Sequence, residues 1–217
     1  MLLNLRAILF GLAAVAVACS SLRADFVMTA RPNATYLSRS TLLDFTDPDF
    51  TLVGAVSGSG ETLTYDNTLE EFTVPGTWNT WNHPPVVETA TPRVGDTAGD
   101  SLTITLSRPA STFGFELEPD SLTTDEVTAA FFSGSTPVGT IDAFPNGNAG
   151  ALLYAASSST NPFTSVLITD LAGNDFAIAR QRFTLATPEP APLILVGSIL
   201  LAGCYWLRVR RRARRFL

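Results

Sequence analysis

The sequence predicts an all-β fold, an antiparallel β-sandwich of jelly-roll kind, in residues 25–186. Apolar and polar residues alternate in many short segments, which is the pattern of strands with one buried face. Clusters of Gly, Ser and Asn divide these segments. No window of 12 residues in this region keeps a helical period with capping residues. Many short strands divided by turns favour a sandwich over other fold classes.

The clearest alternation lies in the middle of the chain. Residues 101–108 and residues 113–118 carry apolar side chains at every second position, and Pro109-Ala110-Ser111 lies between them. This pattern predicts a β-hairpin with its turn at residues 109–111. The other predicted strands are residues 50–56, 69–74, 126–132, 138–143, 151–155, 163–169 and 175–185. The stretch 76–92, rich in Pro, Trp and Asn, predicts a long loop.

The N-terminus has the pattern of a secretory signal peptide. Residues 1–6 carry one positive charge, residues 7–18 are apolar, and small and polar residues follow. We expect cleavage after Ala24, which gives a signal peptide of residues 1–24. The alternative is cleavage before Cys19, where Ala16-Val17-Ala18-Cys19 looks like a lipoprotein site.

The C-terminal segment, residues 187–217, has three parts. Pro188-Glu189-Pro190 precedes an uncharged run of 17 residues, 191–207, and a basic tail, 208–217. A helix of this run would be about 26 Å long, at the low end for crossing a bilayer. The tail contains Arg208, Arg210, Arg211, Arg212, Arg214 and Arg215. By the positive-inside rule the tail stays in the cytoplasm and the preceding chain lies outside it.

The order of signal peptide, Pro-Glu-Pro tripeptide, apolar run and arginine tail resembles the PEP-CTERM proteins. These are exported bacterial proteins that an exosortase, a membrane-embedded processing enzyme, recognises. The resemblance implies that Pro188, Glu189 and Pro190 form the recognition element. It implies as partners the exosortase, signal peptidase, the Sec export machinery and the inner membrane, in a Gram-negative host that makes exopolysaccharide. The protein would be anchored by the C-terminal helix until processing and then reside in the cell envelope or outside the cell.

The middle of the chain also resembles a body domain common among PEP-CTERM proteins. The resemblance covers residues 101–183 and includes Phe113-Gly114-Phe115, Phe131-Phe132-Ser133-Gly134 and Asp175-Phe176-Ala177-Ile178-Ala179. It implies a β-sandwich and carries no assigned activity.

The part expected to be exported is acidic and lacks reactive side chains. Residues 25–189 hold 20 acidic residues and six arginines, a net charge of −14, and the chain has no lysine. Such a domain is a poor partner for nucleic acid. Both cysteines, Cys19 and Cys204, fall in the terminal segments, so the domain has no disulfide. Its single histidine, His83, leaves little ligand set for a transition metal.

Two acidic patterns merit attention. Glu116 and Glu118 lie two apart on a predicted strand, so both face one side, as a pair of glycosidase carboxylates would. The alternative is a solvated strand face. Asp47 with Asp49, or Asp170 with Asn174 and Asp175, could supply oxygen ligands to Ca²⁺, with turn chemistry as the alternative.

The remaining candidates lie in the predicted long loop. His83 could act as the base of a Ser-His-Asp triad, but no Gly-x-Ser-x-Gly motif accompanies it, which favours a structural role. Trp78 and Trp81 could stack on sugar rings if they are exposed side by side. Alternatively, they cap the end of the core.

Two functions therefore remain. The first is an exported, exosortase-sorted protein of the cell envelope or extracellular matrix, without catalytic residues or cofactor, that associates with exopolysaccharide. The second is a secreted glycoside hydrolase or carbohydrate-binding module that uses Glu116 and Glu118 or Trp78 and Trp81. We favour the first.

Overall fold

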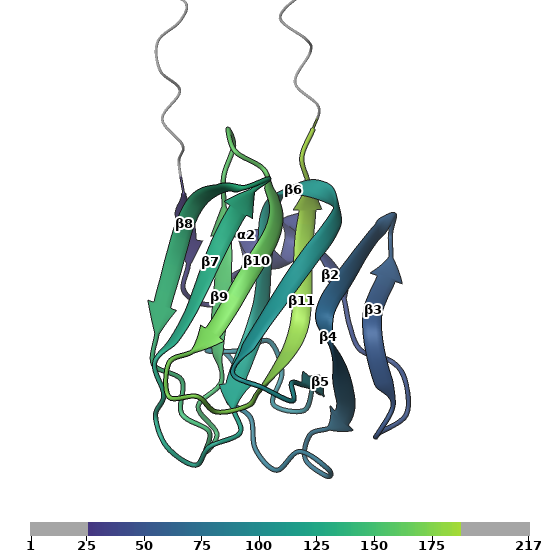
Figure 1. Ribbon diagram of the computed structural model, residues 1–217, viewed down its shortest axis with the longest axis vertical. Helices are drawn as coiled ribbons and strands as arrows, with labels where there is room; N and C mark the ends of the chain where they lie inside the picture. Colours follow the sequence, from purple (N-terminus) through teal and green to yellow (C-terminus); the bar gives the residue numbers. More distant parts are fainter. Residues whose placement is uncertain (1–25, 188–217) are drawn as a thin grey trace, which may run out of the picture. The chain divides into compact units, whose positions relative to one another are not determined.

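A computed structural model describes residues 26–187, which form an antiparallel β-sandwich with one short helix (Figure 1). The elements are β1 (Val27–Thr29), α2 (Ala34–Arg39), β2 (Thr41–Leu43), β3 (Leu52–Gly58), β4 (Glu61–Thr73), β5 (Arg93–Asp96), β6 (Ser101–Pro119), β7 (Val127–Ser133), β8 (Thr136–Ala143), β9 (Leu152–Ser157), β10 (Phe163–Asp170) and β11 (Phe176–Leu185). In residues 26–187, no helix has the length and apolar character needed to cross a membrane. The predicted signal peptide, Cys19, the Pro188–Pro190 motif, the apolar run and the arginine tail lie outside the described residues.

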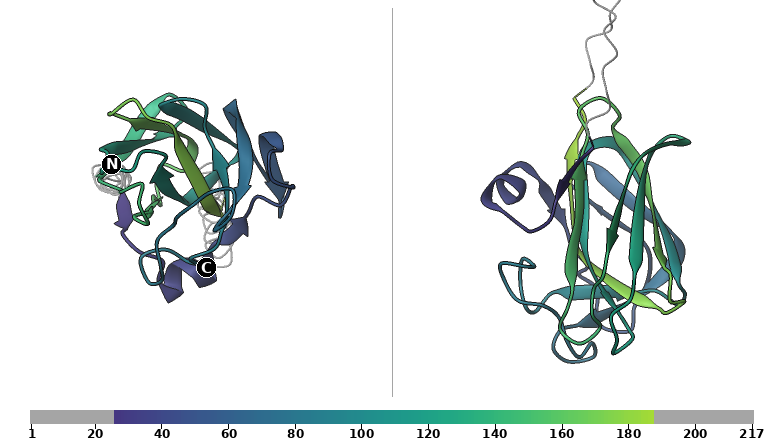
Figure 2. Two further views of the ribbon diagram at one scale, coloured as in Figure 1. Left: turned by 90° about the horizontal axis from the view of Figure 1, so that it is seen from below. Right: turned by 90° about the vertical axis from the view of Figure 1, so that its left-hand side faces the viewer.

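Strand β6 belongs to both layers of the sandwich. Its first half pairs with β4 and β10, and its second half pairs with β9 and β11. One layer therefore contains β3, β4, β6, β10, β7 and β8. The other contains β5, β11, β6 and β9, with β1 and β2 at its margins (Figures 1 and 2).

The predicted hairpin at residues 109–111 is wrong. Pro109, Ala110 and Ser111 lie inside the continuous strand β6. Ala110 pairs with Phe163 of β10 and with Leu185 of β11, and both ladders shift register there. A proline has no N–H to donate to a ladder, so it fits the point where the strand leaves one layer for the other.

The other strand predictions correspond to observed elements. The seven remaining segments overlap β3, β4, β7, β8, β9, β10 and β11. The predicted loop contains neither helix nor strand between Thr73 and Arg93. The sequence reasoning missed the short elements β1, β2, β5 and α2, which have too few residues for a period to be visible.

The main core lies between the two layers and is rich in aromatic side chains. Phe113, Phe115, Phe131 and Phe163 are fully buried, and the ring of Phe115 stacks on that of Tyr154 with centroids 5.7 Å apart. Burying a side chain of this size stabilises the fold by about 1.5–3 kcal/mol. Since the domain has no disulfide, this core is the main source of its stability.

The second layer is covered on its outer face as well. Trp78, Trp81 and Val87 of the long loop pack against Ala177 and Ala179 of β11. Helix α2 stands outside the two layers in the right-hand view of Figure 2 and packs through Tyr36 on β9. Small residues of the sheet allow this approach. A Cβ on Gly114 would lie only 2.6 Å from the Tyr36 hydroxyl oxygen.

Candidate functional site

The two predicted tryptophans and the two predicted glutamates come together, but inside the protein. Trp78 and Trp81 are 8% and 2% exposed, and Glu116 and Glu118 are fully buried. The indole N–H of Trp81 donates to Glu116 Oε2 at 3.1 Å, and that of Trp78 donates to Glu118 Oε2 at 3.1 Å. The loop thus docks on β6 through two matched indole–carboxylate hydrogen bonds.

The remaining carboxylate oxygens are also occupied. Glu116 Oε1 accepts from the backbone N–H of Glu88 at 2.5 Å, and Glu118 Oε1 accepts from Thr80 Oγ1 and from Gly150 N–H, both at 3.2 Å. Burial raises the pKa of Glu116 to about 7, although hydrogen bonds from Glu88 and Trp81 oppose this. Burial likewise raises the pKa of Glu118.

These contacts correct three expectations. The indoles lack the exposure that stacking on a sugar ring requires, because they cap the outer core of the second layer. The glutamates do not form a solvated strand face. Nor do they line a groove as a hydrolase would need, because the loop covers them and donates to all four oxygens.

A bulge in β11 supplies the charges that hold the same loop. Ala179 pairs with Glu116 but Arg182 pairs with Gly114, so β11 carries one extra residue, and Arg180 has a φ of 51°. The extra residue places Arg180 and Arg182 on the outer face together. Arg182 contacts both oxygens of Glu88, at 2.6 and 3.0 Å, and Arg180 contacts Glu88 Oε2 at 3.0 Å.

The structure also places Asp49 and His83, two further candidates from the sequence. Asp49 accepts hydrogen bonds from Thr73 and Thr77 and forms an ion pair with Arg93, so a protein cation already lies beside its carboxylate. The His83 side chain is exposed, and its imidazole makes no hydrogen bond within residues 26–187. Within residues 26–187, Asp49 thus does not form the calcium site, and His83 does not form the catalytic triad, that the sequence offered as alternatives.

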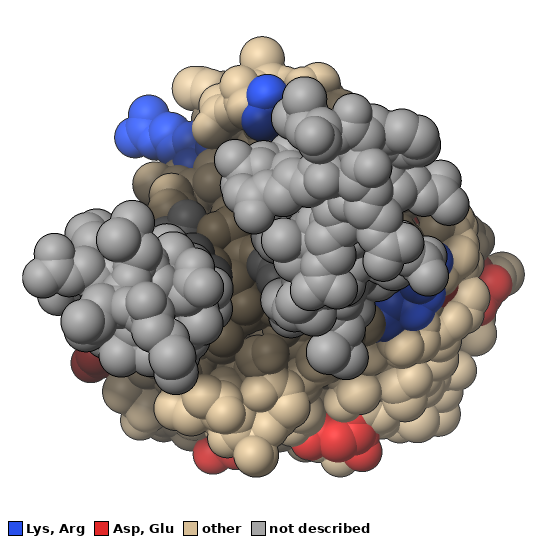
Figure 3. Space-filling model, turned by 90° about the horizontal axis from the view of Figure 1, so that it is seen from above, with Lys and Arg blue, Asp and Glu red and all other residues tan. Residues whose placement is uncertain are grey.

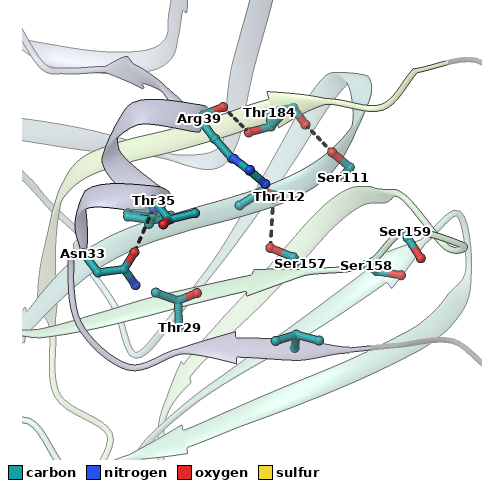
Figure 4. Close-up of a pocket in the computed structure, with 12 residues that line it drawn as sticks. Thr29, Asn33, Thr35, Arg39, Ser111, Thr112, Ser157, Ser158, Ser159 and Thr184 are labelled. Atoms are coloured by element: carbon teal, nitrogen blue, oxygen red, sulfur yellow. Dashed lines mark hydrogen bonds between the residues drawn. The ribbon is translucent and has the colours of Figure 1, made fainter.

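An open pocket of about 560 Å³ lies elsewhere, between α2, β1, β9, the middle of β6 and the end of β11 (Figure 4). Eight of its twelve lining residues are serine or threonine: Thr29, Thr35, Ser111, Thr112, Ser157, Ser158, Ser159 and Thr184. Asn33 and Arg39 come from α2 and its N-cap, and Val27 and Tyr36 complete the wall. The volume is within the range of about 300–1,000 Å³ that is usual for small-molecule sites.

The pocket has a distinct charge and hydrogen-bonding character. Among the described lining residues Arg39 is the only charged one, and none of the five ion pairs in residues 26–187 uses it. The side chain of Arg39 extends from α2 toward the pocket (Figure 4). The hydroxyls of Thr112 and Ser157 share a hydrogen bond of 3.0 Å. The side chains of Thr29 and Thr35 make none within the described chain.

The described chain begins and ends beside this pocket. Val27 pairs with Ser157, Ser157 with Thr112, and Thr112 with Thr184, so the four residues form one row across β1, β9, β6 and β11. Arginine as well as acidic side chains are visible at this end of the sandwich (Figure 3). The pocket therefore gathers hydroxyls and one cation on a domain whose net charge is strongly negative.

Sequence reasoning did not find this pocket. Its residues come from five separate segments, and serine and threonine are ordinary residues of strand ends and turns. The run Ser157-Ser158-Ser159-Thr160 is the one local sign of a hydroxyl-rich surface, but in the sequence it has the pattern of a polar turn. Only the fold shows that its three serines lie in the pocket wall with residues of α2.

No protein-family model matches the chain, and no curated protein matches it. Several solved structures share distant likeness. The enzymatically active domain of tailspike protein 4 of bacteriophage CBA120 is 17% identical with a TM-score of 0.32, and the match covers 58% of this chain and 19% of that one. This chain thus spans about a fifth of the length of the tailspike structure.

Two carbohydrate-binding modules match over more of their own length. TmCBM61 in complex with β-1,4-galactotriose is 9% identical with a TM-score of 0.38, and the match covers 64% of this chain and 99% of that one. A family 11 module from Clostridium thermocellum, in complex with a β-1,3-1,4-mixed-linked tetrasaccharide, is 11% identical with a TM-score of 0.33, covering 68% and 96%. At these values the likenesses bear on neither the ligand nor the activity of this chain.

Proposed function

We propose that this protein is an exported, exosortase-sorted protein of the bacterial cell envelope or extracellular matrix that binds anionic polysaccharide without cleaving it. The binding part of the proposal rests on one observation: the 560 Å³ pocket lined by eight serine and threonine residues, Asn33 and Arg39, which forms no ion pair within residues 26–187. The sorting part rests on the tripartite C-terminal sequence.

The lining matches the chemistry of an acidic sugar. Side-chain hydroxyls both donate and accept hydrogen bonds, as sugar hydroxyls do. A guanidinium binds a carboxylate through charge-assisted, often bidentate, hydrogen bonds. None of the described residues that line the pocket is acidic, so none of them would repel a uronate. With no carboxyl, histidine or cysteine in the lining, the pocket residues themselves support binding rather than acid–base chemistry.

The test measures binding of the full chain to polygalacturonate and to neutral dextran by affinity electrophoresis. We expect retardation by polygalacturonate alone, and a loss of affinity of about 10-fold or more in Arg39→Met, because a hydrogen bond to a charged group is worth about 1.5–3 kcal/mol. Arg31→Met is the matched control, since Arg31 is exposed and does not line the pocket. Equal binding by Arg39→Met and the wild type would refute the proposed site.

A further inference from the structure

Two buried aspartates meet at the end of the sandwich where β10 finishes and β7 begins. Asp170 is the last residue of β10 and pairs with Val127, and Asp125 lies two residues before Val127. Leu171 N–H donates to the carbonyl of Glu126 at 2.9 Å, which ties the two segments together. Asp125 and Asp170 are only 4% and 1% exposed.

Asp125 is held as an acceptor by neutral donors. Its Oδ2 accepts from Ser121 Oγ at 2.6 Å and from Asn174 Nδ2 at 2.9 Å, and its Oδ1 accepts from Thr123 Oγ1 at 2.9 Å. Burial favours a raised pKa for Asp125, but these hydrogen bonds outweigh burial and lower the pKa overall.

Asp170 has one satisfied oxygen and one unsatisfied oxygen. Its Oδ1 accepts from Ala172 N–H at 2.7 Å, whereas the buried Oδ2 has no hydrogen-bond donor within residues 26–187. Asp125 and Asp170 lie within hydrogen-bonding reach of each other, but two carboxylates can form that bond only if one carries a proton. Burial, reinforced by the negative charge of Asp125, raises the pKa of Asp170.

Within residues 26–187, neither aspartate of this pair forms an ion pair. The five ion pairs of residues 26–187 use Arg93, Arg180 and Arg182, and none involves Asp125 or Asp170. The chain has no lysine, and its only histidine lies in the loop on β6. A buried pair of carboxyl groups without a protein cation must hold either a proton or a bound cation.

We propose that Asp125 and Asp170 bind a divalent cation of the Ca²⁺ class, which fixes the turn after β10 to the segment before β7. The two carboxyl groups and the hydroxyls of Ser121 and Thr123 are oxygen ligands, which suit Ca²⁺ rather than a transition metal. Both hydroxyls and the side-chain amide N–H of Asn174 contact the carboxylate of Asp125. Nowhere in the described chain do three or more acidic, histidine or cysteine side chains form a metal cluster, so two carboxylates and neutral oxygens would share the ion.

The proposed cation site overlaps one of the calcium sites that the sequence suggested. Asp170 and Asn174 belong to both, but the second carboxylate is that of Asp125 and not that of Asp175. The sequence alone does not indicate this pair, because Asp125 lies 45 residues before Asp170. The site is independent of the pocket on α2, so either proposal can fail alone.

The test is thermal unfolding of the full chain at pH 7.5 in EDTA, in CaCl₂ and in MgCl₂. A cation present at 100 times its Kd raises Tm by about 5–10 °C for a domain of this size. We expect that rise in Ca²⁺, a smaller one in Mg²⁺, and none in Asp170→Asn. The control Asp142→Asn removes an exposed charge on β8 and should respond as the wild type does.

Each result decides the matter. An unchanged wild-type Tm in Ca²⁺ and EDTA, with no Ca²⁺ binding by calorimetry, means that the pair holds a proton and overturns the proposal. An equal rise of Tm in Mg²⁺ would indicate general charge screening and would overturn the proposal. A rise of Tm in Ca²⁺ that persists in Asp170→Asn would place the ion elsewhere and would overturn it too. If Asp170→Asn fails to fold, Asp125→Asn takes its place, and binding of Tb³⁺ to the wild-type protein, with displacement by Ca²⁺, is followed by terbium luminescence. Absence of such binding would overturn the proposal.

Discussion

Glu116 shows how a carboxyl group can be buried without an ion pair of its own among residues 26–187. Two N–H donors, from the indole of Trp81 and the backbone of Glu88, face its two oxygens at 3.1 and 2.5 Å. Burial nevertheless raises its pKa to about 7, so the native protein carries a proton there under mildly acidic conditions. The residue therefore couples the docking of the long loop to pH.

The sign of this coupling is fixed by the direction of the shift. The unfolded chain releases the proton of Glu116 near pH 4.3, whereas the folded protein keeps it to about pH 7, so the contribution to stability falls as pH rises between these values. Glu116→Gln should abolish this pH-dependent contribution. The decrease in unfolding free energy from pH 5 to pH 8 should therefore be about 3 kcal/mol smaller in the variant than in the wild type. Urea denaturation at both pH values measures it, with the exposed Glu126→Gln as control. An unchanged pH dependence in Glu116→Gln would contradict the shift.

At the scale of the element, the bulge in β11 decides how the outer layer is held. Without the extra residue, Arg180 would take the inward position that Gln181 now occupies, where the Gln181 amide hydrogen-bonds Tyr65 at 2.7 Å. Instead Arg180 and Arg182 both reach Glu88, and Arg182 also donates to the carbonyls of Leu37 and Ser40 at the end of α2. One strand irregularity thus fastens the loop and the helix to the same sheet.

Glu88→Ala should show how much the ion pairs of Glu88 with Arg180 and Arg182 contribute to the unfolding free energy. The substitution leaves two partly buried arginines without their shared partner, which typically costs about 3–5 kcal/mol for a buried pair. Because Arg180 and Arg182 are 20% and 12% exposed, we expect about 2–3 kcal/mol in urea denaturation at pH 7. The loop should also become sensitive to proteolysis. A loss no larger than that of the control Glu126→Ala would show that the ion pairs contribute nothing measurable.

The elements also explain how far sequence reasoning reached. Short apolar segments bounded by turn clusters located β3, β4 and β7–β11. Such reasoning failed at β6, where a proline that usually marks a turn instead marks a change of layer. It could not foresee the bulge, because the residue with positive φ is Arg180 rather than Gly or Asn. The indole–carboxylate pairs of the loop were equally hidden, because they join residues 35 and 40 positions apart.

At the scale of the whole molecule, the domain has two separately organised ends. The row from Val27 to Thr184 places both ends of the described chain beside the hydroxyl-lined pocket (Figure 1). The aspartate pair lies at the opposite end of β10. The pocket, the cation site and the sorting sequence involve different residues, so each proposed property can be tested without disturbing the others.

The sorting proposal predicts where the protein goes, and two variants separate its components. Deletion of residues 188–217 should release the domain into the soluble extracytoplasmic fraction, because the apolar run that would anchor it is gone. Replacing Pro188, Glu189 and Pro190 by alanine keeps that run, so this variant should remain in the membrane fraction at full length while the wild type is processed. Fractionation and immunoblotting of an exosortase-bearing host measure both. If the deletion leaves the distribution unchanged, the segment is not an anchor; if the alanine variant is processed normally, the tripeptide is not the recognition element.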